Sequence, residues 1–238
     1  MYFGDEKIVD AVPNDTCNQV HPHFQLKKIL QTTQRPIKLL DLGCGAGNSF
    51  AAFKKYSDLI EWYGLDVESS PEVDSRVHQS ANILTYDGIH IPFDDNFFDI
   101  IYSNQVLEHV LFPFELIKEV NRVLKKGGHF VGSVSYLELY HSYSVYNYTP
   151  YGLKMFLENN GMKLIELRPG PDILTMLLQK ILGKIPFFSK LLLYQYDHES
   201  VPNVLLTLFL KLLRKSNTQV NLVKLLFSGH IRFLSQKV

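Results

Sequence analysis

The stretch KLLDLGCGAGNS (residues 38–49) passes from apolar residues through alternating glycines into polar residues. The apolar part predicts a buried strand over 37–42, and the residues after the glycines predict a helix over 48–56. Glycines let the backbone turn sharply and let a ligand approach the main chain closely. The start of the helix offers free N–H donors to an anionic group. The loop is therefore a candidate binding site, although tight strand-to-helix turns are also common without a ligand.

Short apolar segments alternate with helical segments outward from this loop. The predicted strands are 37–42, 60–65, 80–84, 98–103, 129–135, 162–167 and 230–236, and the predicted helices are 18–33, 48–56, 113–124 and 149–160. This alternation predicts an α/β fold with a Rossmann-like, doubly wound, seven-stranded and mostly parallel sheet. Helices cover both faces, and a helical insert precedes the last strand. Such sheets bind ligands at the carboxyl ends of their strands.

The predicted elements divide the chain into four parts. Residues 1–36 form an N-terminal helical segment, and residues 37–170 form the core of the fold. Residues 171–228 form a basic, amphipathic helical insert, and residues 229–238 return to the core as its last strand.

Composition excludes several classes of protein. The chain has 238 residues, of which 46% are apolar and 20% charged, so global disorder is excluded. Its 24 basic and 24 acidic side chains argue against a nucleic-acid partner. The two cysteines, Cys17 and Cys44, suit a reducing cytoplasm better than a disulfide framework. No signal peptide and no apolar run long enough to span a membrane is visible, so we expect a cytoplasmic protein.

An acidic residue follows the second predicted strand. Asp66, in the sequence YGLDVE, lies 25 residues after Asp41. A carboxylate at this position can accept hydrogen bonds from both hydroxyls of a ribose, as in sites for NAD and for S-adenosylmethionine. The dinucleotide pattern G-x-G-x-x-G would need a glycine where Asn48 stands, so the spacing disfavours NAD. The alternative for Asp66 is a solvated loop aspartate.

Four segments carry a resemblance to a known family. In chain order they are DLGCGAGNS, LDVE, YDGIHIPFDDNFFDIIYSNQVLEHV and RVLKKGGHFVGSV. In this order and spacing they resemble the class I S-adenosylmethionine-dependent methyltransferases, and more closely their small-molecule, type 11-like branch. The resemblance covers about residues 37–135. It implies S-adenosylmethionine as cofactor, S-adenosylhomocysteine as product, and methyl transfer to an O, N or C nucleophile of a small molecule.

The resemblance also implies which residues hold the cofactor. The glycine loop and the segments after the next three strands would supply them. The implied residues are Asp41, Gly43, Cys44, Gly45 and Gly47 for the amino-acid end, Asp66 and Val67 for the ribose, Asp87 and Gly88 for the adenine, and Ser103, Asn104 and Gln105 near the methyl group. Asn82 is the alternative contact for the adenine.

Two histidines are candidates for a general base. His109 belongs to the LEHV motif, and His141 lies in the loop after the fifth strand. A base is needed only when the acceptor must lose a proton. The alternative for His109 is a structural role, in which it holds the following helix in place.

A tyrosine-rich segment, SYLELYHSYSVYNYTPY (residues 135–151), follows the fifth strand. Tyrosine offers apolar area and one hydroxyl, which suits an amphipathic acceptor. The predicted substrate contacts are Tyr140, Tyr143, Tyr146 and Tyr148. The alternative is a surface loop whose tyrosines pack on the edge of the sheet.

The C-terminal part of the chain is basic. Residues 171–238 hold nine basic and three acidic side chains, against 15 and 21 in residues 1–170. Basic residues beside leucines over 173–227 suggest contact with an anionic membrane at its inner surface. This favours a lipid-linked, quinone-like or glycan acceptor. A lid, a subunit interface and plain core packing are the alternatives for this segment.

Two other functions remain open, and no metal is expected. The first alternative is a catalytically silent, membrane-attached binding or scaffold protein with a methyltransferase fold, and the second is an NAD-dependent oxidoreductase. No group of histidines and carboxylates in the sequence has the spacing typical of metal ligands.

Overall fold

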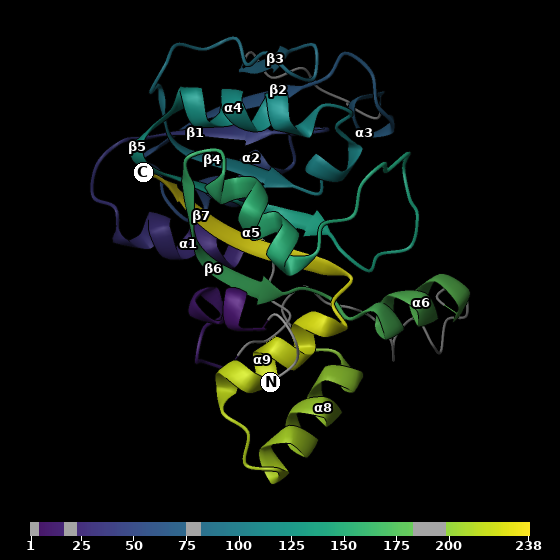
Figure 1. The fold of residues 1–238 in the computed structure, drawn as a ribbon. Helices are drawn as coiled ribbons and strands as arrows, with labels where there is room; N and C mark the ends of the chain where they lie inside the picture. Colours follow the sequence, from purple (N-terminus) through teal and green to yellow (C-terminus); the bar gives the residue numbers. More distant parts are fainter. Residues whose placement is uncertain (1–4, 17–22, 75–81, 183–198) are drawn as a thin grey trace.

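Seven strands form one sheet in the order β3-β2-β1-β4-β5-β7-β6 (Figure 1). The computed structural model describes residues 5–16, 23–74, 82–182 and 199–238. The strands are β1 Ile37–Leu42, β2 Ile60–Asp66, β3 Ile83–Thr85, β4 Phe98–Asn104, β5 Leu124–Ser135, β6 Met162–Pro169 and β7 His230–Lys237. The predicted α/β class and mostly parallel sheet are confirmed.

The strand order reverses direction beside β1. Strands β1 to β5 pair in parallel, whereas β7 runs antiparallel to both β5 and β6. The chain moves from β1 outward through β2 to β3, then crosses back to place β4 on the other side of β1. The carboxyl ends of β1 and β4 therefore form the switch point at which doubly wound sheets bind ligands.

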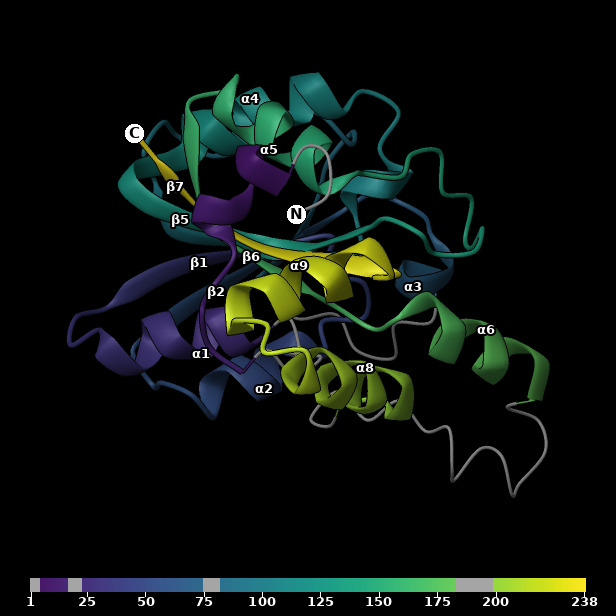
Figure 2. The ribbon, with the colours of Figure 1, turned by 60° about the horizontal axis from the view of Figure 1, so that its bottom comes forward.

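Helices cover both faces of the sheet, with α4 and α5 on one face and α1 and α2 on the other (Figure 2). The helices are α1 His23–Thr32, α2 Ser49–Lys54, α3 Pro71–Asp74, α4 Pro113–Val123, α5 Pro150–Glu158, α6 Ile173–Leu182, α8 Val201–Leu212 and α9 Asn217–Leu226. Three short 3₁₀ turns are η1 Asp5–Lys7, η2 Val9–Ala11 and η3 Leu107–His109.

The two faces follow from the alternation of side chains along each strand. Leu39 packs in the cluster beneath α1 and α2, whereas its neighbour Leu40 packs in the larger cluster with α4 and α5. Both leucines are fully buried, because helices cover both faces of the sheet at β1. Thr149 caps α5 through its hydroxyl, which accepts a hydrogen bond from Gly152 N at 3.0 Å, as the sequence predicts.

Most described elements match their predicted ranges to within one or two residues, and β5 is the clear exception. Strand β5 begins at Leu124, five residues before the predicted start, because Leu124 already pairs with Phe98 directly after α4. Strand β3 spans Ile83–Thr85, and the first two residues of the predicted strand lie outside the described residues. Residues 18–22 of the first predicted helix lie outside them too.

The predicted C-terminal insert contains α6, α8 and α9 within its described part. Helix α9 contributes Leu222 and Leu225 to the main core and lies beside β6, so this helix is part of the folded body. Helix α8 packs on α9 and lies farther from the sheet (Figures 1 and 2). No helix among the described residues has the length and apolar character needed to cross a bilayer.

Candidate active site

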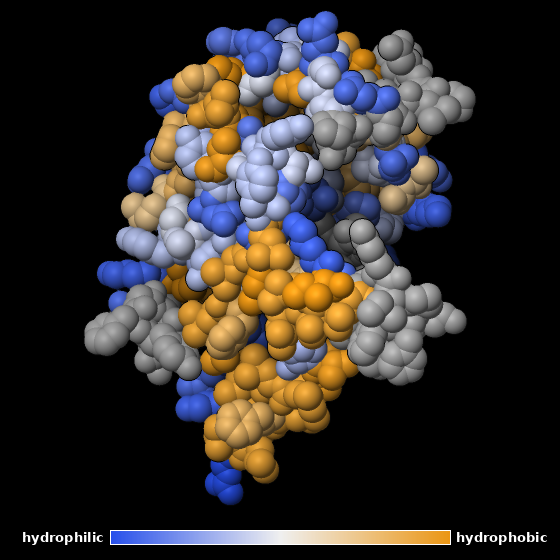
Figure 3. Space-filling view, turned by 90° about the vertical axis from the view of Figure 1, so that its right-hand side faces the viewer, coloured by the Kyte–Doolittle hydropathy of each residue, from blue (hydrophilic) through white to orange (hydrophobic). Residues whose placement is uncertain are grey.

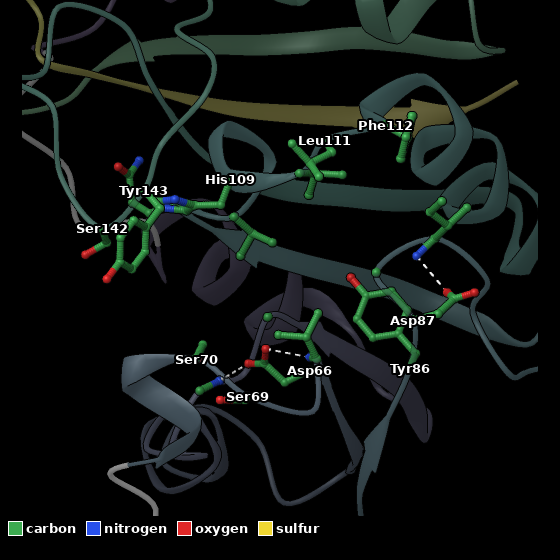
Figure 4. A pocket seen from close by; sticks show the side chains of 18 of the residues that line it. Asp66, Ser69, Ser70, Tyr86, Asp87, His109, Leu111, Phe112, Ser142 and Tyr143 are labelled. Carbon is green, nitrogen blue, oxygen red and sulfur yellow. Dashed lines mark hydrogen bonds between the residues drawn. The ribbon is translucent and has the colours of Figure 1, made fainter.

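A cavity of about 870 Å³ opens at the switch point (Figure 4). Residues from the ends of β1, β2 and β4 form its floor, and loops after β3, β4 and β5 form its walls. Its size falls in the usual range for small-molecule sites, about 300–1,000 Å³. The predicted residues that line it are Gly43, Gly45, Asp66, Val67, Asp87, Gly88, Asn104, Gln105, His109, His141 and Tyr143.

Gly43 brings the main chain to the wall of this cavity. Its φ of +74° is unfavourable for residues with a side chain, and a Cβ atom would lie 2.3 Å from Val106 Cγ2. The segment after β4 lies so close to the glycine loop that only a hydrogen atom fits between Gly43 and Val106. The fold therefore requires a glycine at position 43, in addition to any role of this residue in binding.

Asp66 ends β2 with its carboxylate inside the cavity. Its Oδ2 accepts a hydrogen bond from Gly45 N at 2.5 Å, and its Oδ1 accepts one from Val67 N at 2.8 Å. The side chain is buried. The glycine loop and the acid after the second strand, which are 21 residues apart, thus form one unit. The carboxylate of Asp66 therefore lies against the main chain of the glycine loop at the wall of the cavity.

Asp41 lies behind the glycine loop instead of in the cavity. It is buried and accepts a hydrogen bond from Ser49 Oγ, which connects the end of β1 to the start of α2. Burial raises the pKa of Asp41 to about 7, against the opposing effect of its hydrogen bonds. Burial thus stabilises the neutral form of Asp41 in the folded chain.

The loop after β3 forms the opposite wall. Tyr86 and Asp87 both face the cavity (Figure 4). Asp87 Oδ1 accepts hydrogen bonds from the backbone N–H groups of Ile89 and His90 at 2.9 and 2.7 Å. The hydrogen bond from the His90 ring lowers the pKa of Asp87 to about 2, so this wall carries a negative charge.

The residues after β4 form the inner end of the site. Asn104 and Gln105 line the cavity, and Gln105 adopts a φ of +56°. Residues other than glycine rarely occupy this region, and such strain is concentrated at functional sites. Gln105 N donates a hydrogen bond to Ser133 O at 3.0 Å, which holds the turn against β5.

Next to this turn, three groups from two segments come together. Ligand atoms of Glu108, His109 and His141 all lie within 4.8 Å of one another. The rings of His109 and His141 meet edge to face, with centroids 5.1 Å apart. Glu108 is fully buried, and burial raises its pKa to about 7. The fold therefore places both predicted candidates for a base beside a buried carboxyl group.

The tyrosines of the loop after β5 separate in space. All three of Tyr140, Tyr143 and Tyr146 are exposed, but only Tyr143 lies at the wall of the cavity. Tyr148 is buried, and its hydroxyl donates a hydrogen bond to Leu107 O at 3.1 Å, which fastens the end of the loop to η3. Of the four predicted substrate contacts, only Tyr143 reaches the cavity.

Other predicted cofactor residues are not among those that line the cavity. Besides Asp41, these are Cys44, Gly47 and Ser103. Several further residues line the cavity without having been predicted from the sequence, namely Ser69, Ser70, Asp74, Tyr86, Ile89, Val106, Val110, Leu111, Phe112 and Ser142. Most of them lie within about ten residues after a strand end, so position after a carboxyl end is the signal that points to them.

Comparison with known proteins agrees with this arrangement. The family model described as a methyltransferase domain matches residues 40–132. An uncharacterized methyltransferase of Schizosaccharomyces pombe is 31% identical over 129 residues, which are 48% of this chain and 43% of that protein. Cycloartenol-C-24-methyltransferase 1 of Oryza sativa subsp. japonica is 32% identical over 115 residues, covering 45% and 32%. The chain thus spans less than half the length of these relatives.

A solved structure shows the same fold. The S-adenosylmethionine-dependent methyltransferase from Mesorhizobium loti superposes with a TM-score of 0.54 and 14% identity, over 91% of this chain and 98% of that one. The matched family model covers the glycine loop, Asp66 and the motifs that follow β4. The resemblance of residues 37–135 to a methyltransferase domain is confirmed over residues 40–132.

Proposed function

We propose that the chain transfers a methyl group from S-adenosylmethionine to a small acceptor that it takes from a lipid phase. The observation that carries the methyl transfer is the cavity at the switch point, where Gly43, Gly45 and Asp66 meet. The match of residues 40–132 to the methyltransferase family model supports this reading.

The cofactor lies along the floor of the cavity in this proposal. The Asp66 carboxylate accepts hydrogen bonds from the ribose hydroxyls, and the N–H groups of the glycine loop face the amino-acid end. The adenine packs beside Tyr86 and Asp87. Asn104 and Gln105 then lie near the methyl group, at the inner end that His109 and His141 also line.

Methyl transfer asks for alignment more than for acid–base chemistry. The positively charged sulfur of the cofactor is already a good leaving group, so the enzyme must hold the nucleophile in line with the S–CH₃ bond and exclude water. A base enters only if the acceptor must lose a proton. His109 and His141 remain the candidates for such a role.

Exposed apolar residues near the cavity favour a lipidic acceptor. Leu111 and Phe112 line the cavity and are 65% and 55% exposed. Helix α6 approaches the same opening, because Lys180 Nζ lies 3.4 Å from Tyr140 O in the loop after β5. Figure 3 shows apolar side chains gathered over the part of the molecule that α6 and α8 occupy.

Helix α8 presents an apolar stripe to solvent instead of to the core. Its exposed residues recur with helical spacing, at Val201, Val204, Leu205, Leu208, Phe209 and Leu212. An ordinary surface helix buries such a stripe. Lys211, Arg214 and Lys215 lie at the end of the stripe and are exposed. Apolar and basic residues together suit the surface of an anionic bilayer.

The name of the rice relative, which specifies cycloartenol, supports an acceptor of lipidic character. A lid over the substrate and a subunit interface are the competing uses of α6 and α8. Both would cover the same apolar stripe, and neither gives a role to the three basic residues at its end.

A labelling experiment tests this function. Purified chain, S-adenosylmethionine with a tritiated methyl group and a host extract are incubated together, and the label is partitioned between organic and aqueous phases. Enzyme-dependent label in the organic phase is the expected result. Label in the aqueous phase alone would keep the methyl transfer and reject the lipidic acceptor. If no label moves and S-adenosylhomocysteine fails to bind, the silent scaffold becomes the better description.

A further inference from the structure

We propose that Glu108, His109 and His141 form a binding site for one divalent transition-metal ion, with Zn²⁺ as the ion that this ligand set favours. The site lies beside the inner end of the cavity and goes beyond the proposed methyl transfer. Two imidazoles and one carboxylate are typical of zinc sites that keep an open position. Mg²⁺ and Ca²⁺ prefer ligand sets made of oxygen alone.

The distances allow a common ion. The three ligand atoms lie within 4.8 Å of one another. Ligand atoms on a tetrahedral zinc are about 3.3 Å apart, because each bond is about 2.0–2.1 Å long. Side-chain rotations that move these atoms by about an ångström therefore suffice to close the site around an ion.

The main chain keeps the two contributing segments together. The backbone N–H groups of Val145 and Tyr146 donate hydrogen bonds to Glu108 O at 2.8 and 3.1 Å. The hydroxyl of Tyr148 reaches Leu107 O from the same loop. The loop that carries His141 is thus fastened to the turn η3 that carries Glu108 and His109, so the three ligands are arranged before any ion arrives.

Glu108 gives an independent reason to expect a cation. Its side chain is fully buried, and its Oε1 lies 2.9 Å from Ser135 Oγ. Its other oxygen, Oε2, is buried and has no hydrogen-bond donor among the described residues. A buried carboxylate oxygen without a donor is costly, and an ion between it and the two imidazoles would remove that cost.

A second carboxylate supports one of the ligands. Glu138 Oε1 lies 3.5 Å from His141 Nδ1. Glu138 itself is held by His230 Nε2 at 2.7 Å and by Ser135 Oγ at 2.6 Å. Histidines that bind metals commonly have a carboxylate beside the other ring nitrogen, which fixes the orientation of the ring. This arrangement leaves His141 Nε2 as the atom that binds the ion.

The open position of the ion would face the cavity. His109 and His141 both line the cavity wall, whereas Glu108 closes the site from inside the protein. An oxygen atom of an acceptor could bind there beside the methyl group. The expectation of no metal rested on spacing along the sequence, and His109 and His141 are separated by the whole of α4 and β5.

Direct metal binding tests the proposal without acceptor or cofactor. The 238-residue chain, without a histidine tag, is freed of metal with a chelator. It is then dialysed against a low concentration of ZnCl₂, and the zinc bound per chain is measured by mass spectrometry. We expect one ion per chain. Glu108→Gln and His141→Asn should each weaken binding at least tenfold, and Glu138→Gln should weaken it less. Cobalt should give the visible absorption bands of a four- or five-coordinate site.

The control variant is His129→Asn, which changes a partly buried histidine in the middle of β5, six residues before Ser135. It should bind zinc like the unchanged chain. Circular dichroism and binding of S-adenosylhomocysteine verify that each variant folds, and if Glu108→Gln does not fold, His141→Asn and His109→Asn decide. Absence of stoichiometric zinc, or equal binding by the folded ligand variants and the control, would overturn the site and leave the proposed methyl transfer intact.

Discussion

At the scale of single residues, the cavity depends on side chains that act on the main chain of another segment. Asp66 is the clearest case, because its two oxygens accept hydrogen bonds from Gly45 N and Val67 N. A ribose bound here would share the same carboxylate. The position of the acid therefore fixes both the shape of the glycine loop and the place of the cofactor in our proposal.

The first prediction concerns this carboxylate. Asp66→Ala should lower the affinity for S-adenosylmethionine at least tenfold, because hydrogen bonds to a charged group contribute about 1.5–3 kcal/mol. Isothermal titration calorimetry measures the change. The matched control is Asp58→Ala, which removes an exposed carboxylate. Unchanged affinity in a folded Asp66→Ala variant would remove the ribose contact from the proposal.

Asp41 leads to a prediction about pH. Its pKa is about 7 in the folded chain, against 3.8 as the ordinary value. Between these values the folded state holds more protons than the unfolded state, so the free energy of unfolding falls as pH rises. Asparagine at position 41 cannot ionise. In Asp41→Asn the free energy of unfolding should therefore decrease by about 2 kcal/mol less between pH 5 and pH 8 than in the unchanged chain.

Urea unfolding at the two pH values measures the effect of Asp41. Asp58→Asn is the control. Because Asp58 is exposed, this substitution should not change how much the free energy of unfolding decreases between the two pH values. Parallel pH profiles for the unchanged chain and Asp41→Asn would show that Asp41 ionises normally.

At the scale of elements, α8 and α9 differ although they are neighbours in the chain. Helix α9 has Leu222 and Leu225 in the core, whereas α8 leaves its apolar stripe in solvent. Lys224 is buried and paired with Glu199, so it does not belong to the basic surface. Leucine content alone did not separate the helix that supports the sheet from the helix with a free apolar face.

This difference predicts a local effect on membrane binding. Leu208 is 62% exposed, so Leu208→Glu should leave the fold intact. A leucine inserted in a bilayer contributes about 1.5–3 kcal/mol, and its loss should reduce sedimentation with anionic liposomes about tenfold or more. The control is Leu59→Glu, which changes an exposed leucine in the loop before β2. Equal sedimentation of both variants would reject α8 as the contact.

At the scale of the whole molecule, the cavity joins segments from the glycine loop to the loop after β5. A ligand that fills it should therefore stabilise the entire fold and not one loop. At a concentration about one hundred times its Kd, S-adenosylhomocysteine should add about 2.7 kcal/mol to the free energy of unfolding. For a chain of this size the midpoint of thermal unfolding should rise by roughly 5–10 °C.

Differential scanning calorimetry with NADH as the matched ligand completes this test. NADH should leave the midpoint unchanged, since the glycine spacing disfavours a dinucleotide. A rise with NADH and none with S-adenosylhomocysteine would contradict the assignment of the cofactor.

Local patterns along the sequence predict most of the fold. Apolar runs and the alternating glycines specify the strands, the turn after β1 and the cap of α5, because these features depend on neighbours within a few residues. The same holds for the acid at the end of β2. The boundaries of β3 and β5 were less accurate, since pairing with other strands sets where a strand begins.

The sequence by itself thus determined the α/β sheet, the glycine loop and the position of Asp66. Only the tertiary structure decided that Glu108, His109 and His141 meet, that Tyr143 alone of the four candidate tyrosines reaches the cavity, and that the apolar stripe of α8 stays exposed. These features join segments far apart in the chain. Strand order and the packing of helices on the sheet set such contacts, and no short stretch of sequence records them.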